Sequence, residues 1–104
     1  MASTFSVVFT FTARNDVDNI CTYIAERLSN PTAASRFSDR ITSFAKSLSS
    51  FPKRYRVRKK NRKGQEIRYM PSDNFVIMYY VDDVRLMVNV IRVVFAGRNI
   101  DEMI

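Results

Sequence analysis

The N-terminal part of the chain begins with an alternating pattern. Phe5, Val7, Phe9 and Phe11 are separated by shorter residues, mostly Ser and Thr, which predicts a β-strand rich in aromatic side chains. The spacing then changes to three or four residues: Val17, Ile20, Ile24 and Leu28. This pattern predicts an amphipathic helix over residues 13–28 with Thr12 as its N-cap.

A second helix is predicted directly after the first. Asn30 is suited to an N-cap and Pro31 to the first helical position, where a missing N–H costs nothing. The apolar stripe of this helix, over residues 31–49, is the larger of the two, so we expect it to lie against the sheet. Because only two or three residues join the helices, they are expected to form an antiparallel hairpin. Asp16 and Asp18 fall in the first turns of the first helix, where the helix dipole favours anions.

Three further strands are predicted in the second half of the chain, over residues 65–70, 75–81 and 85–95. The order β-α-α-β-β-β predicts an α+β fold of two layers. In this fold the helical hairpin covers one face of a mainly antiparallel, four-stranded sheet, and the other face stays open. Polar or amphipathic residues of the last three strands are candidates for the open face: Arg68, Tyr79 or Tyr80, Asn89 and Arg92.

Composition limits the classes of protein that remain. A chain of 104 residues has room for one core, so residues 1–104 are expected to form a single domain. No apolar run is long enough to cross a membrane, and the N-terminus lacks the pattern of a signal peptide. One cysteine (Cys21) and no histidine argue against a disulfide and against an ordinary zinc site. We therefore expect a cytoplasmic protein without metal or cofactor.

The positive charge is concentrated in one segment. The net charge is +7, and residues 53–63 hold the whole excess, without a single anion. The cations of this basic segment are Lys53, Arg54, Arg56, Arg58, Lys59, Lys60, Arg62 and Lys63. Such a cluster is typical of a surface that binds a polyanion or an acidic peptide, and a solvated loop kept soluble by its charge is the alternative.

Three local patterns, taken together with the order of elements, resemble one known family. They are residues 18–25 on the first helix, the Leu48-Ser-Ser-Phe-Pro52 exit from the second helix, and Tyr79-Tyr-Val-Asp82 followed by residues 90–99. The chain resembles the RelE/ParE superfamily of bacterial type II toxins from Phe5 to Asn99. The resemblance implies a growth-inhibiting toxin, of the kind that also stabilises plasmids. A cognate antitoxin would silence it by laying an acidic segment over the basic groove, in a hetero-oligomer of toxin and antitoxin.

The resemblance implies two alternative activities. RelE-like members are ribosome-dependent mRNA endoribonucleases (mRNA interferases), and ParE-like members inhibit DNA gyrase. For a nuclease, Arg68 and Arg92 are the candidate catalytic residues, because they fall about where the family places functional arginines. Arg92 lies in an apolar strand, and a charge there must face solvent, a partner or a ligand.

The C-terminal segment favours the ParE-like activity. RelE-like nucleases usually carry a Tyr or His just after the last strand, and residues 95–104 contain neither. The segment from Arg92 to Asn99 instead looks like the ending of ParE-type toxins, with Arg98 as a candidate contact to the target or the antitoxin. The sequence therefore favours a gyrase inhibitor that is not itself an enzyme, with the endoribonuclease as the alternative.

Overall fold

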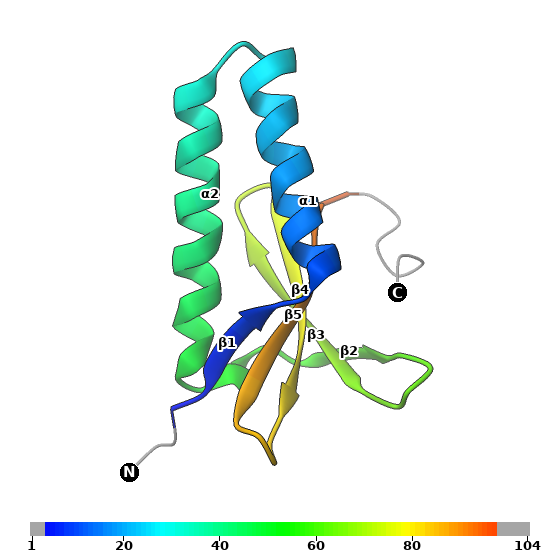
Figure 1. Ribbon diagram of the computed structural model, residues 1–104. Helices are drawn as coiled ribbons and strands as arrows, with labels where there is room; N and C mark the ends of the chain where they lie inside the picture. Colours follow the sequence, from blue (N-terminus) through cyan, green and yellow to red (C-terminus); the bar gives the residue numbers. More distant parts are fainter. Residues whose placement is uncertain (1–3, 98–104) are drawn as a thin grey trace.

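The computed structural model describes residues 4–97. Strand β1 (Ser6–Phe9) leads into helix α1 (Phe11–Thr22), which continues as a π-helical turn (Tyr23–Arg27). Helix α2 (Pro31–Lys46) returns antiparallel to α1 (Figure 1). Two 3₁₀ turns follow, Ser47–Ser49 and Pro52–Arg54. The chain then forms β2 (Val57–Lys60), β3 (Glu66–Ser72), β4 (Phe75–Asp82) and β5 (Met87–Phe95).

Within residues 4–97 the strands make one five-stranded sheet in the order β1-β5-β4-β3-β2. β1 runs parallel to β5, and the other neighbouring pairs are antiparallel. Both helices lie on one face of this sheet, so the predicted α+β fold of two layers is confirmed (Figure 1). The predicted number of strands was wrong by one. β2 forms inside the basic segment, which had no hydrophobic alternation to indicate a strand.

The two helix starts differ in how well the sequence predicted them. Asn30 caps α2 as expected, since its side chain accepts a hydrogen bond from the Ala33 N–H at 3.0 Å. Helix α1 begins earlier than predicted: Thr10, and not Thr12, accepts the capping bond from the Ala13 N–H at 3.2 Å. The alternating pattern runs on to Phe11, but the strand ends at Phe9 and leaves Phe11 exposed in the first helical turn.

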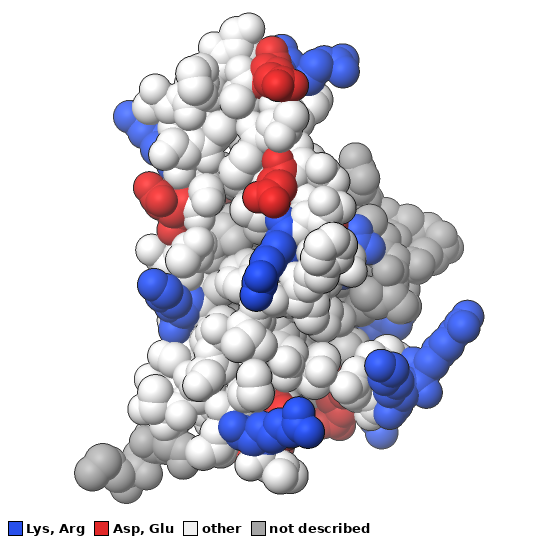
Figure 2. Space-filling model, in the orientation of Figure 1, with Lys and Arg blue, Asp and Glu red and all other residues white. Residues whose placement is uncertain are grey.

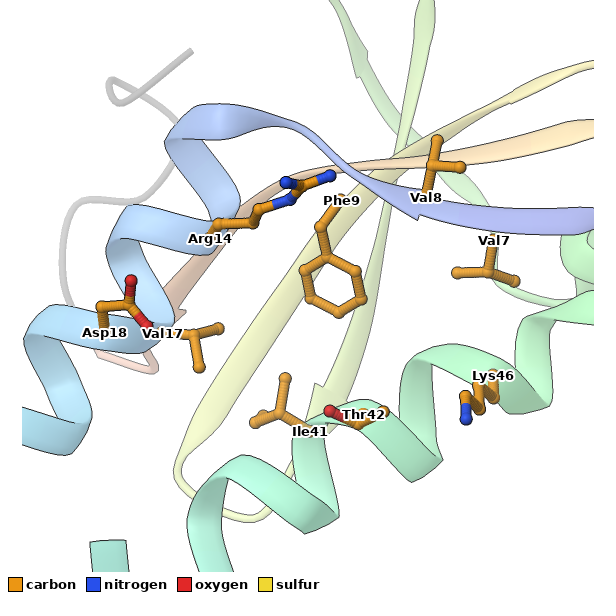
Figure 3. Close-up of a pocket in the computed structure, with 9 residues that line it drawn as sticks. All are labelled: Val7, Val8, Phe9, Arg14, Val17, Asp18, Ile41, Thr42 and Lys46. Carbon is orange, nitrogen blue, oxygen red and sulfur yellow. The ribbon is translucent and has the colours of Figure 1, made fainter. Parts of the chain in front are cut away.

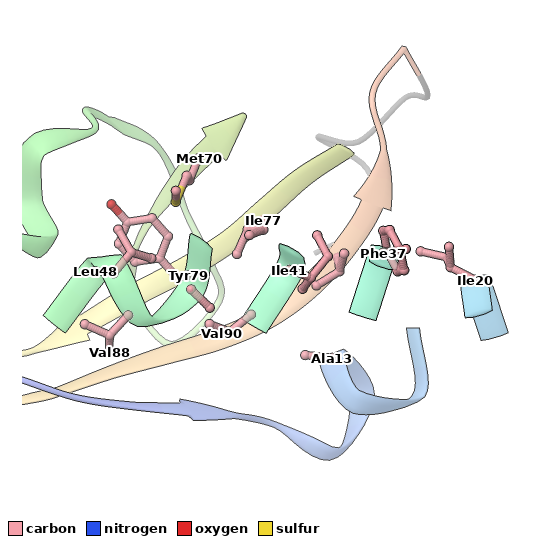
Figure 4. Packing of buried hydrophobic residues seen from close by; sticks show 12 residues of the cluster. Ala13, Ile20, Phe37, Ile41, Leu48, Met70, Ile77, Tyr79, Val88 and Val90 are labelled. Atoms are coloured by element: carbon pink, nitrogen blue, oxygen red, sulfur yellow. The ribbon is translucent and has the colours of Figure 1, made fainter. Parts of the chain in front are cut away.

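The main core lies between the helices and the sheet (Figure 4). Helix α2 contributes Phe37, Ile41 and Ala45 to it, as expected from its larger apolar stripe. The ring of Phe37 packs against that of Phe75 on β4, with 4.5 Å between centroids. Full burial of a side chain such as Ile41 stabilises the fold by about 1.5–3 kcal/mol. The core therefore holds the helical hairpin firmly on the sheet.

The sheet face away from the helices is less polar than predicted. It carries a second buried apolar cluster: Ile67, Tyr69, Val76, Met78 and Val94. Of the polar candidates for this face, Tyr80 packs beside the cluster, and Asn89 is its partner in the β4–β5 register. Tyr79 points the other way, into the main core, because neighbouring residues of a strand face opposite sides.

Within the described residues, no helix is long and apolar enough to cross a membrane.

Candidate functional site

The structure divides the basic segment into two parts with different surroundings. Lys53 and Arg54 belong to the turn that follows α2. The Lys53 ammonium lies 2.7 Å from a carboxylate oxygen of Asp83 in the β4–β5 turn. The Arg54 guanidinium donates to the carbonyls of Ser47 and Ser50, both at 3.3 Å, and to the Ser47 hydroxyl at 2.8 Å. Arg54 therefore stabilises the end of α2, and Lys53 links the following turn to the β4–β5 turn, so both cations are only partly available to a partner.

The rest of the basic segment forms an ordered β-hairpin and not a flexible loop. Its turn is built around Asn61, whose side-chain oxygen accepts from the N–H groups of Lys63 and Gln65, both at 3.0 Å. Gly64 closes the turn with a φ of +80°, a conformation that L side chains rarely adopt. Residues 57–60 are therefore a strand paired with β3 and not part of a loop.

The cations of this hairpin stand along the outer edge of the sheet, because β2 is the last strand in the order. Most are exposed: Arg56, Arg58, Lys60, Arg62 and Lys63. Lys59 is half-buried. Figure 2 shows Lys and Arg side chains gathered over the β2–β3 hairpin, at the right of the view. We call this set the basic hairpin.

Arg58 has a defined position within the basic hairpin. Its guanidinium carbon lies 4.8 Å from the centre of the Tyr69 ring, an arrangement in which the face of the ring attracts the cation. Tyr69 belongs to the second apolar cluster, so the hairpin joins cations to an apolar surface. Charged side chains on an edge strand also prevent pairing with other sheets, which is the purely structural explanation of the cluster.

Arg68, a candidate nuclease residue, is hydrogen-bonded to the backbone of the segment before β2. Its guanidinium donates to the carbonyl of Tyr55 at 2.6 Å and to that of Lys53 at 3.3 Å. Arg68 stands opposite Tyr79 in the β3–β4 register, on the helix-bearing side of the sheet and not on the predicted open face.

Tyr79, on the neighbouring strand β4, also contacts the chain segment 52–55. Its buried hydroxyl donates to the Pro52 carbonyl at 2.6 Å. Burial raises the pKa of Tyr79 to about 12, although the nearby Arg68 and Arg54 favour the ionised form. Tyr79 is therefore a neutral hydrogen-bond donor at physiological pH. Together with Arg68 it holds residues 52–55 against the sheet.

Arg92, the other candidate nuclease residue, has a partner within the chain. Asp16 on α1 receives Arg92 Nε at 2.8 Å and Nη2 at 3.1 Å, and also the Val93 N–H at 2.9 Å. The side chains of Arg92 and Asp16 are only 22% and 14% exposed. We expected a charge in this strand to face solvent, a partner or a ligand, and it faces a partner within the chain. The sequence did not identify Asp16 as that partner, because the prediction placed Asp16 only where the helix dipole favours an anion.

The position of Asp16 follows from where β1 ends. β1 pairs with β5 only as far as Val90, so the next stretch of β5 has an open edge. Helix α1 crosses this edge, and the Asp16 carboxylate accepts the N–H that β1 leaves unpaired. Such a carboxylate, far away in sequence, leaves no local signal.

The structure thus holds the two candidate arginines by different elements, Arg68 by residues 53–55 and Arg92 by α1. Arg98 lies outside the described residues.

A groove runs between β1 and both helices (Figure 3). Its volume is about 490 Å³. Val7, Phe9 and Val17 give it apolar walls. Its charged lining residues are two cations, Arg14 and Lys46, and one carboxylate, Asp18. Apolar walls suit an amphipathic segment, and the excess of one cation favours acidic side chains on it.

Comparisons with known proteins agree with this fold. Residues 7–100 match the sequence model of the family described as the ParE toxin of the type II toxin–antitoxin system parDE. No curated protein matches the sequence closely enough to count as a relative. A chain of the chromosomal ParDE toxin–antitoxin system from P. aeruginosa superposes with a TM-score of 0.72 at 19% identity, over 90% of this chain and 98% of that one.

A second similar structure comes from the toxin–antitoxin complex RelBE2 of Mycobacterium tuberculosis. It has a TM-score of 0.62 at 22% identity, over 88% of this chain and 98% of that one. At such identities the two likenesses concern the fold. The family match covers most of the sequence, and on that ground the chain belongs to the ParE toxin family of type II toxin–antitoxin systems.

Proposed function

We propose that this toxin inhibits DNA gyrase in the cytoplasm and that an acidic segment of its cognate antitoxin neutralises it. The observation that carries the choice of target is the engagement of both arginines that a RelE-like nuclease would need. Arg92 is held by Asp16, and Arg68 by two backbone carbonyls. The charge of Arg92 is already matched by a carboxylate, and the guanidinium of Arg68 is directed toward the backbone of residues 53–55, which makes both less suited to stabilise a phosphate.

The chemistry of RNA cleavage supports the same choice. Attack by a 2′-hydroxyl needs a base, an acid and cations that stabilise the pentavalent phosphate of the transition state. The chain has no histidine, and residues 95–104 contain no tyrosine. The buried Tyr79 hydroxyl, whose pKa burial raises to about 12, is unsuited to proton transfer near pH 7. A protein-binding inhibitor needs none of these groups.

For the antitoxin, two surfaces have complementary chemistry. The basic hairpin offers exposed cations. The groove of Figure 3 offers apolar walls with two cations, Arg14 and Lys46, against one carboxylate, Asp18. An acidic chain that is partly helical could follow both surfaces. Charge complementarity of this kind mainly accelerates association and disfavours wrong partners.

The target is tested with toxin freed from its antitoxin. The freed protein is added to a gyrase supercoiling reaction on relaxed plasmid and, separately, to coupled translation with mapping of the mRNA ends. We expect loss of supercoiling with intact mRNA. Cuts in the mRNA in phase with codons, with unaffected gyrase, would instead establish the ribosome-dependent endoribonuclease.

The antitoxin surface is tested by removing charge from the basic hairpin. The double variant Lys60→Gln/Arg62→Gln is expected to bind the antitoxin about tenfold more weakly at low salt, with a smaller difference at high salt because ions screen exposed charges. The matched control, Arg27→Gln/Arg36→Gln, removes two exposed cations from the helical hairpin. Equal losses in both double variants would show that net charge alone matters and would contradict the assignment of the hairpin.

A further inference from the structure

Two bulky apolar residues adopt a backbone conformation that disfavours them. Phe51 has a φ of 51° and Leu86 a φ of 54°, in the left-handed region where Gly and Asn are common and large side chains are rare. Burial does not offset the conformational strain of either residue, since Phe51 is 70% exposed and Leu86 40% exposed. Strain of this kind clusters at functional sites.

The segments that carry these residues, the chain after α2 and the β4–β5 turn, lie at the end of the molecule opposite the tip of the helical hairpin (Figure 1). Phe5 N–H donates to the Ser49 carbonyl and Ser6 N–H to the Leu86 carbonyl, both at 2.9 Å, so β1 joins the two segments. The ion pair of Lys53 with Asp83 joins them again from the other side. Phe51 lies between these two links in the chain.

The β4–β5 turn holds a third apolar side chain in a fixed position. Val84 is 93% exposed, and the turn around it is hydrogen-bonded. The Asp82 carboxylate accepts from the N–H groups of Val84 and Arg85 at 3.1 and 3.0 Å. Asp83 is occupied by Lys53. The turn therefore presents Val84 rigidly to solvent.

We propose that Phe51, Val84 and Leu86, here called the apolar end, are the surface through which this toxin contacts its target protein. The assignment rests on the proposed function, in which the target is a folded protein. Lys53, Arg54 and Arg85 are exposed and lie close to these residues in sequence. Lys53 pairs with Asp83 and Arg54 bonds to Ser47, so the complementary site is an apolar pocket with an acidic group for Arg85. Rigid apolar anchors that enter a pocket supply much of the free energy in many protein interfaces.

The shape of the apolar end favours the target over the antitoxin as its partner. Val84 stands on a hairpin turn, and Phe51 projects from the junction between two 3₁₀ turns, so the surface is convex. A convex surface needs a concave partner, which a large folded protein provides and a single extended segment does not. The groove of Figure 3 and the basic hairpin suit such a segment better.

The test uses a double variant that removes apolar side chains without weakening the fold. Phe51→Asn places a residue that tolerates positive φ, and Val84→Ser changes a side chain that is almost fully exposed. We expect the melting temperature to stay within about 5 °C of the parent value. Half-inhibition of gyrase supercoiling should need at least tenfold more protein, while antitoxin affinity stays unchanged.

The matched control is Phe11→Ser/Leu28→Ser, which removes two apolar side chains that are 84% and 56% exposed on the helical hairpin. This control should inhibit gyrase like the parent. Val84→Ser alone serves as a second variant, because so exposed a side chain contributes little to folding.

Three results would overturn the assignment. They are unchanged inhibition by the double variant, an equal loss in the control, and a loss of antitoxin affinity in place of target inhibition. If the parent itself leaves gyrase unaffected, the proposed target is wrong and growth arrest becomes the readout. Loss of arrest in the double variant, with antitoxin binding intact, would then support the apolar end as the contact to another protein. Arrest at the parent level would overturn it.

Discussion

Replacing Asp16 by alanine removes an acceptor that serves two different donors. The carboxylate binds the Arg92 guanidinium at two points and the Val93 N–H at a third. Hydrogen bonds to charged groups contribute about 1.5–3 kcal/mol, and a buried N–H without an acceptor costs about 1–3 kcal/mol. Because the Asp16 and Arg92 side chains are 14% and 22% exposed, water replaces these contacts only in part. We therefore expect Asp16→Ala to lower the free energy of unfolding by about 3 kcal/mol.

The measurement is urea unfolding followed by circular dichroism, with thermal melts alongside. A loss of about 3 kcal/mol in a domain of this size corresponds to a fall in melting temperature of at least about 10 °C. Asp16→Asn should lose about half as much, since an amide oxygen can still accept from Val93 but carries no charge. Asp18→Ala is the control, because Asp18 is an exposed carboxylate on the same helix. It should change stability by less than about 0.5 kcal/mol.

A double-mutant cycle with Arg92→Ala isolates the ion pair. If the two side chains stabilise each other, the double variant loses at least about 1 kcal/mol less than the sum of the single variants. Additive effects, or an Arg92→Ala variant as stable as the parent, would refute the reasoning. The contact with Asp16 would then be no argument against the endoribonuclease alternative.

Two further predictions concern single residues of the sheet and its turns. Tyr79→Phe removes the hydrogen bond to Pro52 and should cost about 1 kcal/mol in urea unfolding, whereas Tyr80→Phe should be near neutral. The folded-state pKa of Tyr79 is raised from 10.0 to about 12, so stability should fall as the pH rises through that window, and less so in Tyr79→Phe. Gly64→Ala should lower the free energy of unfolding by about 1 kcal/mol, because alanine is strained at a φ of +80°, and Gly64→Asn by less; equal melting temperatures would contradict this.

The local patterns of the sequence predicted most of the fold for a physical reason. A strand with one buried face and a helix with one buried stripe each repeat apolar residues at a fixed period. That was sufficient for both helices, for β1 and for the last three strands. β2 was not predicted, because an edge strand made of Val and cations buries little apolar surface. Its pairing with β3 is made by backbone groups, which do not affect the pattern of side chains.

The candidate site was predicted less completely. The positions of charged residues are read directly from the sequence, so the basic segment was predicted. Which of its cations are available was not visible. Lys53 pairs with Asp83, which only folding brings near, and Arg54 bonds back to Ser47 because a 3₁₀ turn bends the chain there. The same holds for Arg68, whose partners are backbone carbonyls.

The sequence by itself determined the elements, their order and the concentration of charge, since each depends on neighbouring residues. Tertiary structure alone decided that β1 lies parallel to β5 at the edge of the sheet and ends at Phe9. That ending exposes the Val93 N–H, and the crossing of α1 brings Asp16 to it and to Arg92, 76 residues away. Such contacts depend on where a strand stops and what crosses it, which no local spacing of residues encodes.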